Sequence, residues 1–327
     1  DDHGPARPAE RDFGTFSQKL ERSTGDLVAV VKAHKARSKA PLLVCLCPAT
    51  PELVRHRGYS LFLSRMEEQL KRELKSQPGT YVIQGAAFAD TYPVVQYHDE
   101  VRDQMGHIPY TPTYFSVLGT LVTRALHSIL TPPFKVIVLD CDNTLWKGVC
   151  GEDGAQGVDI SPSYRYLQEQ VVRQQEQGMI VCLCSKNVES DVLEVFKQRP
   201  EMALKLEHVT SHRINWLPKS QNLRALAEEL NLGLDSFIFL DDNPVEIAEV
   251  KAACPQVLAL PVPKEPEALP AFVDHIWAFD RLIVTEEDKK RTQMYRQNKE
   301  RDAFQQSATR FGDFLQGLGL EIRLTAM

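Results

Sequence analysis

The sequence predicts an α/β fold in which a domain with a parallel sheet follows a smaller α/β domain. Three observations lead to this prediction. Four short apolar runs are separated by stretches with helical periodicity, each run is followed by polar residues, and an earlier region alternates strand-like and helical runs. Strands joined through helices form βαβ units, which build parallel sheets. Composition agrees, because 327 residues of which 43% are hydrophobic can bury the cores of two domains.

Four parts follow one another along the chain in this interpretation. They are a polar linker over 1–12, the N-terminal α/β domain over 13–130, the domain with the parallel sheet over 131–285, and a helical connector with the start of a truncated following region over 286–327. The sequence Thr131-Pro132-Pro133 breaks the chain between the two domains. Since the chain does not begin with Met, and 319–327 reads as a strand without a partner, we expect a piece of a longer polypeptide.

The elements of the N-terminal domain come first in chain order. Strands are expected at 41–47 and 80–85, and helices at 13–19, 59–75 and 114–130. In the second domain, β-branched and apolar runs predict strands at 136–139, 179–184, 206–209 and 237–240. Amphipathic stretches between and after them predict helices at 161–177, 189–199, 220–230 and 244–253. Two charged helical segments, 286–298 and 308–317, precede the final strand.

Composition excludes several classes of protein. A net charge of −6 argues against nucleic acid or an anionic membrane as the main partner. No run approaches the roughly 18 apolar residues of a membrane span, and the first residues lack the pattern of a signal peptide, so we expect a cytoplasmic protein. The seven cysteines lie mostly in apolar runs, which favours buried thiols over a disulfide framework or a zinc site.

Acidic residues follow the first and the last strand of the second domain. The first strand leads into Asp140-Cys141-Asp142-Asn143-Thr144, where alternation would place the carboxylates of Asp140 and Asp142 on one side. Two adjacent carboxylates need a cation, and Mg²⁺ suits oxygen ligands. One Asp could then attack phosphorus while the other transfers the proton of the leaving group. The last strand leads into Asp241 and Asp242, which would complete the cation site.

Two further strand ends offer groups that bind phosphate. Ser185 ends the second strand, where its hydroxyl and the following amides could hold phosphoryl oxygens, although a Ser at this place is often only a helix cap. Lys219 opens the next predicted helix and could supply a positive charge, although a single Lys is usually a solvated side chain. Any one of these motifs could occur by chance. All four of them, in this order after four predicted strands, are far less expected by chance.

Together these residues resemble the four motifs of the haloacid dehalogenase (HAD) superfamily. The resemblance implies a HAD-like, Rossmann-type fold and Mg²⁺-dependent phosphoryl transfer. Asp140 would be the nucleophile and Asp142 the general acid/base whose backbone carbonyl also binds the metal. The phosphate-binding set would be Thr144, Ser185 and Lys219, of which Thr144 steadies the first motif. Asp241 and Asp242 would form the acidic fourth motif, with Asp242 facing the metal and Asp241 behind it, or the reverse.

Four segments resemble more closely the FkbH-like branch of that superfamily: 106–112, 139–154, 184–187 and 240–246. FkbH-like proteins act in polyketide biosynthesis. This resemblance implies that the protein loads a glyceryl-type unit from 1,3-bisphosphoglycerate as an enzyme thioester, removes the phosphate and transfers the unit to the phosphopantetheine thiol of an acyl carrier protein.

A thioester step needs a thiol, and two cysteines are candidates. Cys141 lies between the two catalytic carboxylates and is the first choice, although strand alternation points it away from Asp140. Cys150 is the second, within 148–157, which we expect to form a flap over the site. Two alternatives remain: a plain Mg²⁺-dependent HAD phosphatase of small molecules or phosphoproteins, and an inactive module that docks a carrier protein.

Overall fold

The computed structural model describes residues 13–84, 89, 91–282, 284 and 288. The linker expected over 1–12 lies outside these residues, as do the helices and the final strand expected over 286–327, apart from Asp288. The chain divides into two compact units, Asp1–Pro132 and Pro133–Met327. Each unit is described by itself below.

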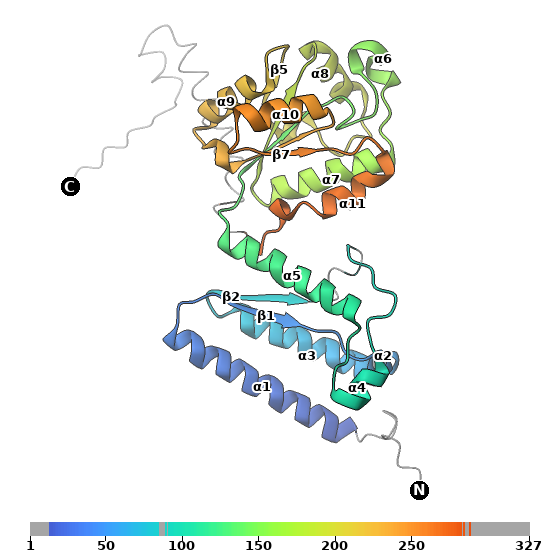
Figure 1. The fold of residues 1–327 in the computed structure, drawn as a ribbon, viewed down its shortest axis with the longest axis vertical. Coiled ribbons are helices and arrows are strands. Elements are labelled where there is room, and N and C mark those ends of the chain that lie inside the picture. The colour runs from blue at the N-terminus through green and yellow to red at the C-terminus, as the bar shows by residue number, and fades with distance from the viewer. Residues whose placement is uncertain (1–12, 85–88, 90, 283, 285–287, 289–327) are drawn as a thin grey trace, which may run out of the picture. The chain divides into compact units, whose positions relative to one another are not determined.

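The first unit has a two-stranded parallel sheet with helices on both faces. Its elements are α1 (Phe13–Arg37), β1 (Leu42–Leu46), α2 (Pro51–Arg55), α3 (Arg57–Lys75), β2 (Thr80–Gln84), α4 (Glu100–Gly106) and α5 (Pro112–Leu130). Strand β1 pairs with β2 from Leu42 opposite Thr80. Figure 1 shows α1 and α3 on one side of this sheet and α5 on the other.

Helix α1 is much longer than the helix expected at 13–19. Thr24, Val28 and Val31 are buried on one face of α1, and Val28 and Val31 pack with Leu70 and Leu74 of α3. The polar residues around Gly25 hide this spacing in the sequence, and the packing against α3 stabilises the added turns.

The second unit has a five-stranded parallel sheet with the strand order β5-β4-β3-β6-β7. The strands are β3 (Val136–Leu139), β4 (Ile180–Ser185), β5 (Val209–Ile214), β6 (Phe237–Asp241) and β7 (Leu258–Pro261). The helices are α6 (Cys150–Gly157), α7 (Pro162–Glu176), α8 (Glu189–Gln198), α9 (Lys219–Leu230), α10 (Pro244–Ala253) and α11 (Leu269–Asp274). Short 3₁₀ helices occupy Leu206–His208, Leu234–Ser236, Pro266–Ala268 and Trp277–Phe279.

Two layers of helices cover the two faces of this sheet (Figure 1). Leu223 and Leu226 of α9 and Val250 of α10 pack with Val136 and Val138 of β3. The opposite face of β3 packs with residues of α7, α8 and α11: Leu167, Val171, Val192, Val195 and Val273. All four side chains of β3 are fully buried, which explains its uninterrupted apolar sequence.

Both edge strands of the sheet differ from the expectation. The residues expected to begin the third strand, Leu206–His208, form a 3₁₀ helix, and β5 begins afterwards at Val209. His208 Nδ1 accepts a hydrogen bond from the Lys205 amide and so stabilises this turn. Strand β7 was not expected, because its four residues end in a proline-rich sequence. Edge strands are half-exposed, so their patterns are weaker than those of central strands.

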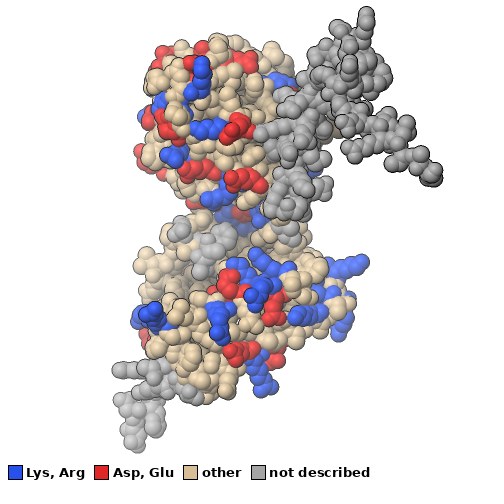
Figure 2. Space-filling view, turned by 180° about the vertical axis from the view of Figure 1, so that it is seen from behind, with Lys and Arg blue, Asp and Glu red and all other residues tan. Residues whose placement is uncertain are grey.

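The surface and the helices carry two further observations. No helix among the described residues combines the length and the apolar character needed to cross a membrane. On the face of each unit that Figure 2 shows, acidic and basic side chains are interspersed, and neither sign covers that face alone.

Candidate active site

The ends of β3, β4 and β6 and the start of α9 meet at one pocket. Its volume is about 370 Å³, and its lining includes six of the residues selected from the sequence. These are Asp140, Asp142, Ser185, Lys219, Asp241 and Asp242. They meet because the carboxyl ends of parallel strands lie at one edge of a sheet. Among the described residues of the lining, Pro244 is the one without a polar side chain.

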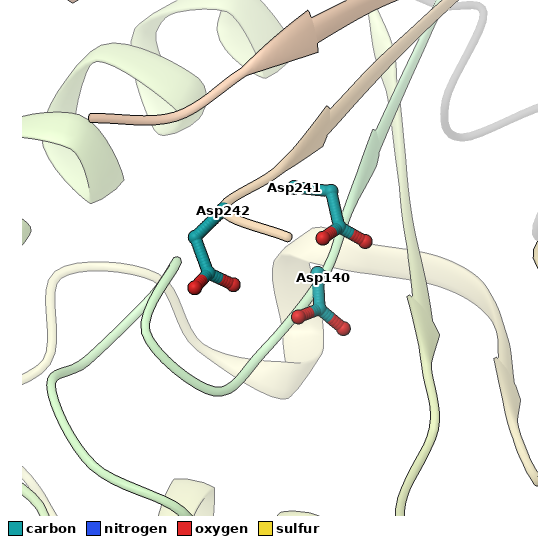
Figure 3. Close-up of side chains that lie close together, drawn as sticks. All are labelled: Asp140, Asp241 and Asp242. Carbon is teal, nitrogen blue, oxygen red and sulfur yellow. The ribbon is translucent and has the colours of Figure 1, made fainter. Parts of the chain in front are cut away.

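Three carboxylates form a tight cluster at this pocket. Asp140, Asp241 and Asp242 each offer one oxygen, and these oxygens lie within 4.8 Å of one another. Figure 3 shows the three carboxylate groups pointing toward a common space. Asp140 and Asp241 are buried, and Asp242 is partly exposed. Such a set of oxygen donors can hold a divalent cation.

The carboxylate of Asp142 has a different set of neighbours. Its Oδ1 accepts hydrogen bonds from Trp146 Nε1 at 2.9 Å and from the Cys150 amide at 3.1 Å, and its Oδ2 accepts one from Asn187 Nδ2 at 3.0 Å. It lines the pocket but is not part of the three-carboxylate cluster. Strand alternation does not extend to Asp142, because β3 ends at Leu139 and the chain turns.

Lys219 balances the charge of the cluster. Its side chain is 3% exposed, and Nζ donates to Asp140 Oδ1 at 2.7 Å and to Asp241 Oδ2. Burial opposes the positive charge, but the two carboxylates outweigh burial, so the pKa of Lys219 is raised. The ammonium also lies 5.6 Å from the centre of the Phe239 ring.

Two acidic groups of the cluster, Asp241 and Asp242, bind protons more readily than ordinary Asp residues. Burial, together with the charge of Asp140, raises the pKa of Asp241 to about 6, although Lys219 opposes this shift. Burial and Asp140 also raise the pKa of Asp242. A cation between these carboxylates would relieve both effects.

Two hydroxyl groups differ in their position. Ser185 is buried at the end of β4, lines the pocket, and accepts a hydrogen bond from Asn187 Nδ2 at 3.0 Å. Thr144 is fully buried outside the pocket lining, and its Oγ1 accepts a hydrogen bond from the Asp242 amide at 3.2 Å. Thr144 therefore connects the loop after β3 to the end of β6.

Neither candidate thiol lies in the pocket lining. Cys141 is 0% exposed and Cys150 is 3% exposed. Burial, followed by the charge of Asp140, raises the pKa of Cys141 well above its usual range. Burial and Asp142 raise the pKa of Cys150 to about 12. In this arrangement both thiols are covered and protonated at neutral pH. The segment expected to form a flap, 148–157, contains α6.

Seven residues of the pocket lining were not selected from the sequence, among them Asn187, Glu246 and Lys264. Asn187 donates to both Asp142 and Ser185, and Glu246 accepts from Lys186. Asn187 and Glu246 lie within the segments 184–187 and 240–246, whose resemblance to known motifs was the available signal. No such signal marks Lys264.

Comparison with known proteins gives matches among solved structures alone. No family model matches the sequence, and no curated protein matches it. The N-terminal part of BF1531 from Bacteroides fragilis, which contains a phosphatase domain and was crystallised with Mg, is 23% identical with a TM-score of 0.68. That match covers 82% of this chain and 74% of the other.

A further match is a putative HAD superfamily (subfamily III A) hydrolase from Legionella pneumophila. It is 14% identical with a TM-score of 0.31, covering 55% of this chain and 94% of the other. The similarity to the Bacteroides structure covers 82% of this chain, which is more than the second unit alone contains. The chain therefore has the HAD-like, Rossmann-type α/β fold, which confirms the fold class that the sequence predicts.

Proposed function

We propose that the protein is a Mg²⁺-dependent phosphatase that hydrolyses phosphate monoesters through Asp140. The observation that carries this proposal is the contact of Lys219 with Asp140 and Asp241, beside Asp242, in a polar pocket. The similarity to a phosphatase domain that was crystallised with Mg supports the same function.

The residues present fit Mg²⁺. Two oxygens bound to one Mg²⁺ are at most about 4.2 Å apart, twice its usual distance to oxygen. The three carboxylate oxygens lie within 4.8 Å of one another, so small side-chain movements bring them into that range. The hard, acidic donor set also favours Mg²⁺ over softer metals. When bound, Mg²⁺ would neutralise the carboxylates and polarise the phosphoryl oxygens.

The chain's own residues divide the chemistry among them. A carboxylate oxygen of Asp140 forms a bond to phosphorus while the bond to the ester oxygen breaks. Asp142 gives that oxygen its proton, so the alcohol leaves and an aspartyl phosphate remains. Asp142 then takes a proton from water as the water attacks phosphorus, which frees phosphate and restores Asp140. Its three hydrogen bonds hold the carboxylate at the pocket for both transfers.

Lys219 and Ser185 hold the phosphoryl group in this proposal. A lysine ammonium has three donors, and Asp140 and Asp241 take two of those of Lys219. The third can go to a phosphoryl oxygen. Ser185 lies at the same pocket, and its hydroxyl proton can go to a second oxygen.

Phosphate release from p-nitrophenyl phosphate and from small phosphate esters tests this function. Turnover should need Mg²⁺ and should stop with EDTA. Asp140→Asn should lower kcat at least about a thousandfold, because it removes the nucleophile. Asp235→Asn, an exposed change just before β6, is the control and should keep full activity. Activity that survives in Asp140→Asn would reject Asp140 as the nucleophile.

We also propose a more specific function from the resemblance to FkbH-like proteins. The protein would take the glyceryl group from 1,3-bisphosphoglycerate as a thioester and pass it to an acyl carrier protein. What supports this proposal is the motif similarity of 139–154, 184–187 and 240–246, and the place of Cys141 between two residues that line the pocket. Because Cys141 and Cys150 are buried, the segment that covers them must move before either thiol can react.

Intact-mass measurement after incubation with 1,3-bisphosphoglycerate and Mg²⁺ tests the thioester. An acyl adduct is expected on the wild type and should be lost in Cys141→Ala or Cys150→Ala. An adduct that survives loss of both thiols rejects the step. Turnover of esters that is indifferent to both thiols and needs no carrier protein favours the plain phosphatase. Inertness toward every phosphate ester and acyl phosphate favours a docking module.

A further inference from the structure

An ion pair at the pocket has no part in the chemistry described above. Lys186 directly follows Ser185 at the end of β4, and Glu246 is in the first turn of α10. Lys186 Nζ lies 2.6 Å from Glu246 Oε1, and both residues line the pocket that holds Asp140 and Lys219. The pair therefore stands beside the proposed reaction centre and comes from two different elements.

Glu246 keeps a buried acceptor without a partner. The residue is 9% exposed, and its Oε2 is buried and makes no hydrogen bond within the described part of the chain. Buried polar atoms nearly always have a partner, and an unsatisfied one implies strain, a water or a ligand. The terminal torsion of Glu is soft. The carboxylate can therefore turn so that one oxygen keeps Lys186 and the other faces the pocket.

We propose that Glu246 accepts a hydrogen bond from a hydroxyl of the leaving group, and that Lys186 is a positioning residue that holds this carboxylate in place. This inference rests on the proposed function, since it assumes that a phosphate ester occupies the pocket. The polar lining fits a hydroxylated leaving group better than an aliphatic or aromatic one. The volume of about 370 Å³ suits a small molecule.

Two esters that differ only in hydroxyl groups isolate this contact: glycerol 1-phosphate and n-propyl phosphate. A hydrogen bond to a charged acceptor is worth about tenfold or more in affinity. The wild type should therefore prefer glycerol 1-phosphate by at least about tenfold in kcat/KM. Glu246→Met, which has no comparable acceptor, should abolish the preference, and Glu246→Gln, which keeps a neutral acceptor, should reduce it in part.

Lys186→Met separates positioning from direct binding. If Lys186 holds Glu246, this variant should lower kcat/KM for glycerol 1-phosphate more than for n-propyl phosphate and so lose part of the preference. An equal loss for both esters would show that Lys186 binds the phosphoryl group and would overturn its assigned role. Glu228→Gln on α9 and Lys251→Gln on α10, both exposed and outside the pocket lining, are the matched controls.

Calorimetric binding of the two esters to Asp140→Asn with Mg²⁺ keeps this inference separate from catalysis. Tighter binding of glycerol 1-phosphate that disappears when Glu246→Met is added supports the inference even if the wild type hydrolyses neither ester. Equal binding of both esters, or no binding of either at millimolar concentration, overturns it. If the wild type hydrolyses both esters equally well, the proposed phosphatase function stands and the role assigned to Glu246 is rejected.

Discussion

At the scale of single residues, Lys219 is the cation on which the acidic cluster depends. It is almost fully buried and contacts both Asp140 and Asp241. Removing one partner from a buried set of charges costs about 3 to 5 kcal/mol, because the remaining charges lose their compensation. Lys219→Met should therefore lower the free energy of unfolding by about that amount at pH 7.5.

The same variant should be less destabilised at pH 5, where Asp241 is more readily protonated. Urea unfolding at the two pH values measures the effect, with Lys251→Met as the control on exposed surface. Addition of Mg²⁺ at pH 7.5 should restore part of the loss. A loss of equal size at both pH values would contradict the assigned role of Lys219 as a balancing charge.

Asp241 gives the metal-free protein a defined pH dependence. Its pKa is raised from 3.8 to about 6, so the folded state binds this proton more tightly than the unfolded state does. The stability from this group is present below about pH 4 and is lost as the pH rises through about 6. Mg²⁺ competes with the same proton, so its stabilising effect should grow over that range.

Thermal unfolding with and without Mg²⁺ at pH 5 and pH 7.5 measures this linkage. A Mg²⁺ concentration of 100 times its Kd adds about 2.7 kcal/mol to the stability. The rise in Tm should be clearly larger at pH 7.5, and Asp241→Asn should reduce it and remove most of its pH dependence. A rise in Tm that is the same at both pH values would mean that Mg²⁺ binds outside the acidic cluster.

At the scale of elements, a hydrogen bond from α7 anchors the loop that follows β3. Gln168 on α7 is fully buried and donates to the Leu145 carbonyl at 2.8 Å. Its Oε1 accepts from the amides of Ala203 and Leu204 at 2.8 and 3.3 Å. One side chain thereby satisfies three backbone groups in two loops. Leu145 belongs to the loop that carries Asp142 and Thr144.

Gln168→Leu should lower the free energy of unfolding by at least about 2 kcal/mol, because it removes the partner of three backbone groups, two of them in buried hydrogen bonds. It should also reduce kcat, since the loop that positions Asp142 loses an anchor. Urea unfolding and phosphate release measure the two effects. Gln221→Leu, exposed on α9, should change neither. A variant with wild-type stability would show that water replaces the amide.

The central elements could be predicted from sequence because they are buried on both faces. The limits of β3 were predicted because four apolar residues stop at Asp140. The edge strands β5 and β7 were not placed correctly, since polar residues and prolines interrupt them. The candidate site residues were selected from the residues that follow the apolar runs, and six of them line one pocket. Glu246 was missed because its contact with Lys186 joins positions 60 residues apart.

The orientation of Asp142 could not be predicted either. Side chains alternate between the two faces of a sheet only within a strand. The loop after β3 instead turns the carboxylate of Asp142 toward Trp146, Cys150 and Asn187. The partner of a loop residue depends on where distant elements pack. The order of residues along one strand does not contain that information.

At the scale of the whole molecule, the two units have separate cores. The core around Val28 and Leu74 belongs to the first unit, and two larger clusters pack against the two faces of the sheet in the second. The three tryptophans of the chain, Trp146, Trp216 and Trp277, all lie in the second unit. Tryptophan fluorescence therefore reports the second unit, while far-ultraviolet circular dichroism reports both.

Mg²⁺ should stabilise the second unit selectively, because the acidic cluster lies there. In urea, Mg²⁺ should raise the midpoint of the fluorescence transition. The part of the circular dichroism signal that comes from the first unit should still change at the midpoint that is observed without Mg²⁺. Asp241→Asn serves as the control that responds little to Mg²⁺. Transitions that coincide by both probes, with and without Mg²⁺, would show that the units unfold as one.

The sheet of the second unit separates packing from reactivity along the sequence. The residues of β3 are fully buried, and Asp140, the proposed nucleophile, comes immediately after them. Directed evolution confined to the few positions after each strand could therefore sample new substrates while the interior keeps the chain foldable. Exchange of the loops that follow the strands is therefore a suitable way to change the substrate that this fold accepts.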